Sequence, residues 1–160
     1  MRKFLATIVA ATSLFYSCSN KVDDVILVSS ALPIDGTQEV PPKAVSGNGT
    51  IDVSYNRGLK TLYYTVKWNS LTGAPTTGFG IYGSAAKGFR PPQLLQSFSG
   101  FAAAQAGTYS STVFIDGVVL KEEDLMNGLY SINIPTAANP ISAVNPAQAG
   151  EIRGQITGLH

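Results

Sequence analysis

Two stretches decide the fold of this chain: Thr50–Tyr55 (TIDVSY) and Leu62–Asn69 (LYYTVKWN). In both, apolar side chains occupy alternate positions, which is the pattern of strands that bury one face and expose the other. The link Asn56-Arg57-Gly58 is short and polar, and we expect its glycine to supply the positive φ of a turn. The two stretches therefore predict an antiparallel hairpin.

The inward face of this hairpin predicts the centre of the core. Leu62, Tyr64, Val66 and Trp68 stand two residues apart, so their side chains share one face of the strand. Each contributes roughly 1.5–3 kcal/mol when it is fully buried. We expect the other strands to pack around this face.

Alternation continues outward from the hairpin and predicts the rest of the architecture. Further strands are expected at Ile26–Leu32, Gly78–Tyr82, Leu94–Phe101, Tyr109–Asp116, Leu129–Ile134 and Glu151–Thr157. Lys121–Asn127 is the one segment with a helical pattern, because acidic residues open it and Gly128 can end it. About eight short strands with one short helix predict an all-β antiparallel sandwich, of the Greek-key immunoglobulin-like or the superoxide-dismutase-like kind.

The N-terminus has the features of an export signal. Arg2 and Lys3 are followed by the apolar run Phe4–Tyr16 and then by Ser17 and Cys18. The pattern resembles the bacterial lipoprotein signal, in which the cysteine becomes the first residue and carries acyl chains. We therefore expect cleavage before Cys18 and a membrane anchor through its lipid.

Three parts of the chain follow from this interpretation. Residues 1–17 form the signal, residues 18–25 a tether, and residues 26–160 one folded domain. An Asp after the cysteine retains some lipoproteins at the inner membrane, whereas this chain has Ser19, so the resemblance implies the cell envelope and its outer membrane. Asp23 and Asp24 resemble a surface-export signal, and a solvated spacer is the equal alternative.

The charge balance argues against nucleic acid as a partner. Loss of Arg2 and Lys3 with the signal leaves nine of the eleven basic residues against ten acidic residues, a formal charge of −1. The remaining basic residues are scattered, whereas a phosphate-binding surface needs them clustered. We expect the partner to be a protein or a polysaccharide.

Four stretches, taken together and in this order, resemble the CHRD domain, a family named after repeats in the animal protein chordin. They are Gly36–Pro42 (GTQEVPP), Val66–Gly73 (VKWNSLTG), Leu125–Ile134 (LMNGLYSINI) and Gly150–Ile156 (GEIRGQI). The resemblance spans about Leu27 to Leu159. It implies one secreted domain that occupies nearly the whole mature chain.

The resemblance also exposes a departure from the family. Its members typically carry a His-x-His pair on the strand after the Leu-Thr-Gly turn and a further His in an Asn-x-His-Thr segment, which suits metal binding. The matching positions here are Gly80, Tyr82 and Pro135. Copper and zinc would lack these imidazole ligands, so we expect neither a metal nor another cofactor.

The chain offers few residues for catalysis. His160 is the only histidine and the last residue, where chain ends usually fray. A catalytic triad would depend on that end, and the lipid would block Cys18. We expect no catalytic residue and no enzyme activity.

Two charged residues interrupt otherwise regular patterns. Glu39 lies in Gln38–Pro42 (QEVPP) and Arg153 lies in Gly150–Gly154 (GEIRG). An arginine near a carboxylate can pair with it across a sheet. A fold-defining ion pair is the favoured interpretation, and a ligand site is the alternative.

The segment Gly83–Gly107 is the expected binding loop. Phe89, Arg90, Phe98 and Phe101 combine intermittent aromatic rings with small residues and a cation. The alternative is that Phe98 and Phe101, with Leu94, face the core.

The leading hypothesis is a non-enzymatic, lipid-anchored envelope protein that binds a protein or a surface polymer through its loops. One alternative is a metal-binding or redox enzyme in which carboxylates and Tyr82 replace the family's histidines. A structural spacer subunit is the other alternative.

Overall fold

The computed structural model describes residues 25–142, 144–145 and 148–160. The expected signal, Cys18 and all of the expected tether except Val25 lie outside the described residues. The described part contains no helix with the length and hydropathy needed to cross a membrane.

The described chain is built almost entirely from β-strands, as the alternating pattern predicted. The strands are β1 (Ile26–Asp35), β2 (Asn48–Asn56), β3 (Thr61–Asn69), β4 (Gly80–Gly83), β5 (Gln93–Ser97), β6 (Gly107–Phe114), β7 (Ser131–Ile134) and β8 (Ile152–Gln155). A short α-helix, α1 (Glu122–Met126), and a 3₁₀ turn, η1 (Gly36–Gln38), complete the described elements. The all-β prediction is confirmed.

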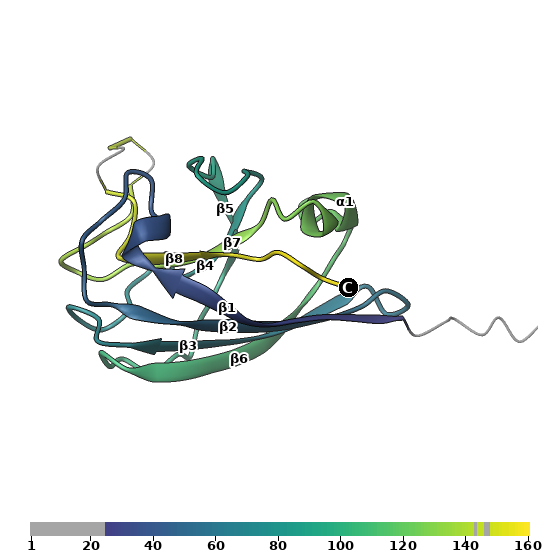
Figure 1. Ribbon diagram of the computed structural model, residues 1–160, viewed down its shortest axis with the longest axis horizontal. Coiled ribbons are helices and arrows are strands. Elements are labelled where there is room, and N and C mark those ends of the chain that lie inside the picture. Colours follow the sequence, from purple (N-terminus) through teal and green to yellow (C-terminus); the bar gives the residue numbers. More distant parts are fainter. Residues whose placement is uncertain (1–24, 143, 146–147) are drawn as a thin grey trace, which may run out of the picture.

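The strands form one antiparallel sheet that curls until its two halves face each other (Figure 1). Its order is β5-β4-β7-β8-β1-β2-β3-β6. The two halves meet where β1 pairs with β8 through Asp35 and Arg153. The two layers of the predicted sandwich are therefore the halves of one sheet, with the core between them.

The hairpin that predicted the core forms as expected. β2 and β3 pair without interruption from Asn48 opposite Asn69 to Asn56 opposite Thr61. Their inward side chains are buried in the core: Ile51, Val53, Tyr55, Leu62, Tyr64, Val66 and Trp68. The prediction for the turn is wrong in one detail, because the positive φ of 49° belongs to Lys60 and not to Gly58.

The predicted helix is confirmed as a single short turn of α-helix. Glu122, Glu123 and Asp124 form its first turn, where their charges favour the positive end of the helix dipole. Gly128 follows with a φ of 66°, a conformation that glycine adopts without strain. Arg57 from the β2–β3 turn contacts this helix through an ion pair of 2.7 Å to Glu122.

The C-terminus does not fray as expected. The backbone N–H of Val28 in β1 donates to the carbonyl oxygen of His160 at 3.1 Å. The last residue is therefore held against the first strand.

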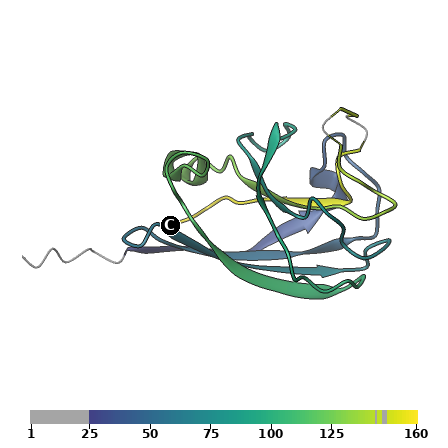
Figure 2. The same ribbon diagram turned by 180° about the vertical axis from the view of Figure 1, so that it is seen from behind.

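The two ends of β1 lie at opposite ends of the molecule, and this separation matters for the site. The described chain enters β1 beside the β2–β3 turn, and it leaves β1 into η1 at the opposite end (Figures 1 and 2). The connection that contains Ile141 and Ala149 lies at the same end as η1. Ten residues of strand span roughly 33 Å, so the two ends are well separated.

Candidate binding site

A pocket of about 360 Å³ opens at the η1 end of the curled sheet. Its wall combines the segment after η1 with β4, β5, β7 and β8 and with two connections that are distant in sequence. The lining residues are Glu39, Val40, Tyr82, Arg90, Pro91, Pro92, Gln93, Leu94, Asn133, Ile141, Ser142, Ala149 and Arg153.

Glu39 reaches this pocket because η1 turns the chain inward after β1. The carboxylate of Asp35 caps the turn by accepting from the backbone N–H of Thr37 at 2.8 Å. The N–H of Glu39 then closes the turn on the carbonyl oxygen of Gly36 at 3.2 Å. The side chain of Glu39 is only 2% exposed.

The carboxyl group of Glu39 has one bonded and one unbonded oxygen. Oε2 accepts a hydrogen bond of 3.2 Å from Nδ2 of Asn133, whereas Oε1 has no partner in the structure. Burial raises the pKa of Glu39 to about 8, although the positive charges of Arg153, Lys43 and Arg90 and the bond from Asn133 act against this rise. Near neutral pH the group is therefore mostly protonated.

Asn133 presents a second unbonded oxygen beside the first. Its Nδ2 also donates to the carbonyl oxygen of Ala149 at 2.7 Å, which fixes the orientation of the amide and leaves Oδ1 without a partner. A Cβ atom placed on Gly150 would overlap both Oδ1 of Asn133 and Oε1 of Glu39. The two unbonded oxygens therefore face the same point of the backbone, where only glycine fits.

Arg153 has an unbonded donor and lies on β8, the strand next to that of Asn133. It is only 1% exposed. Nη1 donates to the carbonyl oxygen of Phe89 at 2.8 Å and Nη2 donates to Oε1 of Gln155 at 2.7 Å, but Nε has no partner. Asn133 and Arg153 are paired across β7 and β8, so their side chains lie on the same face of the sheet.

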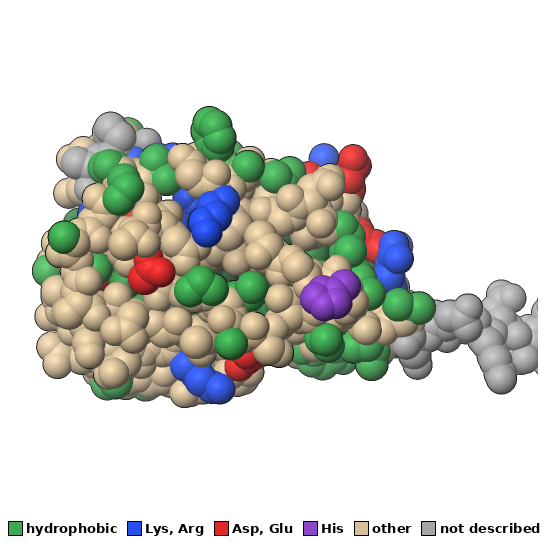
Figure 3. Space-filling model, viewed as in Figure 1, with side chains coloured by type: hydrophobic (Ala, Val, Ile, Leu, Met, Phe, Trp, Pro, Cys, Tyr) green, Lys and Arg blue, Asp and Glu red, His purple; other side chains and the backbone are tan. Residues whose placement is uncertain are grey.

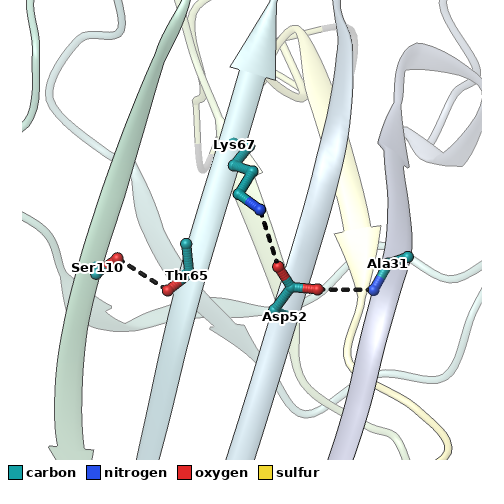
Figure 4. A network of polar contacts seen from close by, with 5 residues as sticks. All are labelled: Ala31, Asp52, Thr65, Lys67 and Ser110. Carbon is teal, nitrogen blue, oxygen red and sulfur yellow. Dashed lines mark hydrogen bonds and ion pairs between the residues drawn. The ribbon is translucent and has the colours of Figure 1, made fainter.

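The expected ion pair between Glu39 and Arg153 is wrong. The ion pairs among the described residues join Arg57 to Glu122 and Lys67 to Asp52, and the second lies on the outer face of the sheet (Figure 4). Glu39 and Arg153 share the pocket without direct contact between their charges. The alternative interpretation, that both residues belong to a ligand site, is therefore retained.

Two further side chains shape the entrance. Arg90 donates to the backbone carbonyl oxygens of Ser142 and Asn145, so its guanidinium is held at the rim. The hydroxyl of Tyr82 donates to the carbonyl oxygen of Gly78 at 2.7 Å. Burial raises the pKa of Tyr82 to about 12, and the charge of Glu39 adds to this effect.

The structure divides the expected binding loop into a core part and a pocket part. Phe98 is buried and stacks on Tyr64 with 4.9 Å between ring centroids, and Phe101 packs against Phe79 at 5.1 Å. By contrast, the ring of Phe89 is 69% exposed, and the next residue, Arg90, lines the pocket. Of the four residues expected to form the binding loop, only Phe89 and Arg90 therefore reach the site.

The three positions that match the family's histidines lie together. Gly80 and Tyr82 are two residues apart on β4, and Gly80 pairs with Asn133 on β7. A Cβ atom on Gly78 would lie 3.2 Å from the hydroxyl of Tyr82 and 3.6 Å from Cγ of Pro135. Among the described residues, no three His, Cys, Asp or Glu side chains gather where they could hold a metal ion.

Sequence reasoning missed Asn133. The segment Ser131–Ile134 (SINI) indicates a buried strand, and all four of its residues are buried in the structure. A polar amide between two isoleucines in such a strand is the one available signal, because a buried amide needs partners.

The model of the CHRD domain matches residues 31–156. The chain belongs to the CHRD family. The match begins within β1 and ends just after β8, so every residue that lines the pocket lies inside the CHRD domain. No curated protein and no solved structure matches the chain.

Proposed function

We propose that this CHRD protein is a non-enzymatic binding module of the cell envelope. In this proposal, lipid on Cys18 anchors the chain at the outer membrane, and the pocket beside Glu39 binds a polar ligand, either free or as part of a surface polymer. One observation carries the assignment of the site. Three buried side chains in the wall of one pocket, Glu39, Asn133 and Arg153, each keep a polar atom without a partner.

The energetic argument for a ligand follows from these three atoms. A buried donor or acceptor without a partner costs about 1–3 kcal/mol, and folded proteins leave few such groups. Three such side chains in the wall of one pocket make this pocket the favoured place for a polar ligand.

The chemistry of the pocket favours binding over catalysis. The hydroxyl of Tyr82 is committed to a backbone oxygen, and its raised pKa keeps it protonated. The hydroxyl of Ser142 accepts bonds from the backbone N–H groups of Val144 and Asn145. Neither arrangement activates a nucleophile through a neighbouring base.

The arrangement of the two ends is compatible with a membrane anchor. The domain begins at Val25, and exposed apolar side chains gather at that end of the sheet and in its turns: Val25, Ile26, Leu59, Phe114, Val118 and Val119. Figure 3 shows hydrophobic side chains close to the point where the N-terminal segment leaves the domain. Exposed apolar side chains beside the anchor and a pocket at the far end suit a module whose binding site faces away from its membrane.

Binding is tested with the full chain in detergent. Thermal unfolding is followed with neutral sugars, sugar acids, amino acids and inorganic phosphate, and we expect at least one class to raise the midpoint. Arg90→Ala removes a rim contact and should reduce this rise, whereas the control Lys67→Ala on the outer face should not. If no class raises the midpoint of the wild type, the proposed binding function fails.

The anchor is tested separately in bacteria that express the full chain. A radiolabelled fatty acid should become incorporated into the wild-type protein and not into Cys18→Ala. Fractionation should recover the wild type with the outer membrane. Labelling of the cysteine variant would refute anchoring at this residue.

A further inference from the structure

We propose that the folded domain itself lies against a lipid bilayer, through the exposed apolar side chains at the end where the described chain begins. These side chains, the apolar tip, are Val25, Ile26, Leu59, Phe114, Val118 and Val119. The inference rests on the proposed anchor at Cys18, because the anchor brings this end of the domain to a membrane. It adds a second contact and a fixed orientation, and it does not depend on what the pocket binds.

Six large apolar side chains are exposed together at this end of the domain. Each is between 45% and 76% exposed, and they are half of the twelve exposed large hydrophobic residues in the described part of the chain. Single exposed apolar residues are ordinary on a protein surface, whereas a group of them marks a surface that contacts a protein or a membrane. Figure 3 shows such side chains where the N-terminal segment leaves the domain.

Backbone hydrogen bonds join the segments that form the apolar tip. The N–H of Arg57 donates to the carbonyl oxygen of Val25 at 3.0 Å, which ties the β2–β3 turn to the start of β1. The N–H of Ile115 donates to the carbonyl oxygen of Lys60 at 2.7 Å, which ties the same turn to the end of β6. Leu59 lies between these two bonds. The three segments therefore form one continuous surface.

The turn after β6 is ordered and holds its two valines outside the core. Oδ1 of Asp116 accepts from the N–H of Val118 at 2.8 Å and from the N–H groups of Val119 and Leu120 at 2.9 Å. Leu120 is buried, whereas Val118 and Val119 are exposed. The exposure of these valines is thus built into a hydrogen-bonded turn.

The proposed anchor can bring the apolar tip to the bilayer. Val25 is seven residues after Cys18 in the sequence, and seven residues span at most about 25 Å. The tip lies at the end of β1 where the chain enters the domain, whereas the pocket lies at the opposite end (Figure 1). The apolar tip is therefore the surface nearest to the acyl chains.

The charges around the tip indicate contact through apolar side chains and not through anionic headgroups. Arg57 is paired with Glu122 at 2.7 Å. The other charged residues of the β2–β3 turn, the turn after β6 and α1 are Lys60, Lys121, Asp116, Glu123 and Asp124. A surface that binds anionic lipid through its charge needs an excess of cations, which these segments lack. The contact should therefore be the same on neutral and on anionic bilayers.

The experiment uses the full lipid-anchored chain in phosphatidylcholine vesicles with and without a nitroxide-labelled lipid. Cys18 is the only cysteine and its lipid blocks it, so one introduced cysteine can carry a fluorescent dye. Leu59→Cys and Val118→Cys lie in the apolar tip, and Phe89→Cys, exposed to a similar degree at the pocket end, is the matched control. A dye that enters about 5–10 Å into the boundary of headgroups and acyl chains should lose about half of its emission or more to the nitroxide. The dye at position 89 should lose little.

Val118→Asp combined with Val119→Asp tests the contact while the anchor stays in place. Both side chains are exposed, and Asp116 bonds to their backbone N–H groups, so the double variant should fold. Quenching of the dye on Leu59→Cys should then fall to the level of Phe89→Cys. Phe89→Asp is the matched control and should leave it unchanged. Replacement of part of the phosphatidylcholine by phosphatidylglycerol should also leave it unchanged.

Each other outcome overturns the inference. Equal quenching at positions 59, 118 and 89 would show that no face of the domain prefers the bilayer. Quenching at position 59 that survives both aspartates would show that the valines make no contact with lipid. A dye whose emission is shifted to the blue but not quenched would show that a protein surface, such as that of a second copy of this chain, covers the tip.

Mass spectrometry of the same samples separates this inference from the proposed anchor. A mature chain without the mass of acyl groups on Cys18 overturns the anchor and the inference together. An acylated chain without selective quenching overturns the inference alone and leaves the anchor standing.

Discussion

The buried carboxyl group of Glu39 predicts a specific dependence of stability on pH. Burial raises its pKa from 4.5 to about 8, so between these values the folded protein holds a proton that the unfolded chain has released. Its contribution is fully present below pH 4.5 and is lost as the pH rises to about 8. A shift from 4.5 to about 8 corresponds to about 5 kcal/mol at about 1.4 kcal/mol per pH unit.

Glu39→Gln removes this titration while it keeps the size and shape of the side chain. The free energy of unfolding of the wild type, measured relative to the variant, should fall by about 3–5 kcal/mol between pH 4.5 and pH 9. Trp68 is the sole tryptophan and is 3% exposed, so its fluorescence reports unfolding in urea at each pH. Other titrating groups are common to both proteins and cancel in the difference.

The control is Asp52→Asn. Hydrogen bonding from the backbone N–H of Ala31 is the main cause that lowers the pKa of Asp52, so this group stays ionised throughout the range. The free energy of unfolding of Asp52→Asn should therefore change with pH in the same way as that of the wild type. If the free energy of unfolding changes with pH in the same way in the wild type and in Glu39→Gln, Glu39 is ionised in the folded protein. The account of a buried, neutral carboxyl group in the pocket would then be refuted.

Three further substitutions test the packing. Trp68→Ala should lower the free energy of unfolding by about 3–5 kcal/mol in urea titrations followed by circular dichroism, and a loss below 1 kcal/mol would contradict its central place in the core. Phe98→Ala should cost a similar amount, whereas Phe89→Ala, with its exposed ring, should stay within about 0.5 kcal/mol, and equal losses would show that the loop is misplaced. Arg57→Ala should cost about 1 kcal/mol or less and lose its effect in high salt, because its partner Glu122 is also partly exposed.

Local pattern was enough to predict the elements of this fold. Alternation and turn residues are properties of neighbouring positions, and they located all eight described strands and α1. They did not predict the irregularity of β1 between Ser29 and Leu32, where Ala31 has a φ of 55°. A contact from another strand accompanies this irregularity, since Oδ1 of Asp52 accepts from the N–H of Ala31 at 2.8 Å (Figure 4).

The candidate site was only partly predictable. Glu39 and Arg153 stood out as charges in regular segments, and Arg90 and Tyr82 were named for other reasons. Their meeting depends on pairing between β1 and β8, which joins segments more than a hundred residues apart, and on pairing between β4, β7 and β8. Asn133 was missed because its strand pattern shows burial and not which atoms remain unbonded.

The order of residues by itself determined the strand content, the hairpin at the centre and membership of the CHRD family, because each of these rests on short patterns read along the chain. Only the tertiary structure decided that Glu39 and Arg153 stay apart and face one pocket with Asn133. The physical reason is that hydrogen bonds to distant backbone atoms consume some of their polar atoms and leave others unbonded. Which polar atoms remain unbonded depends on how the sheet curls.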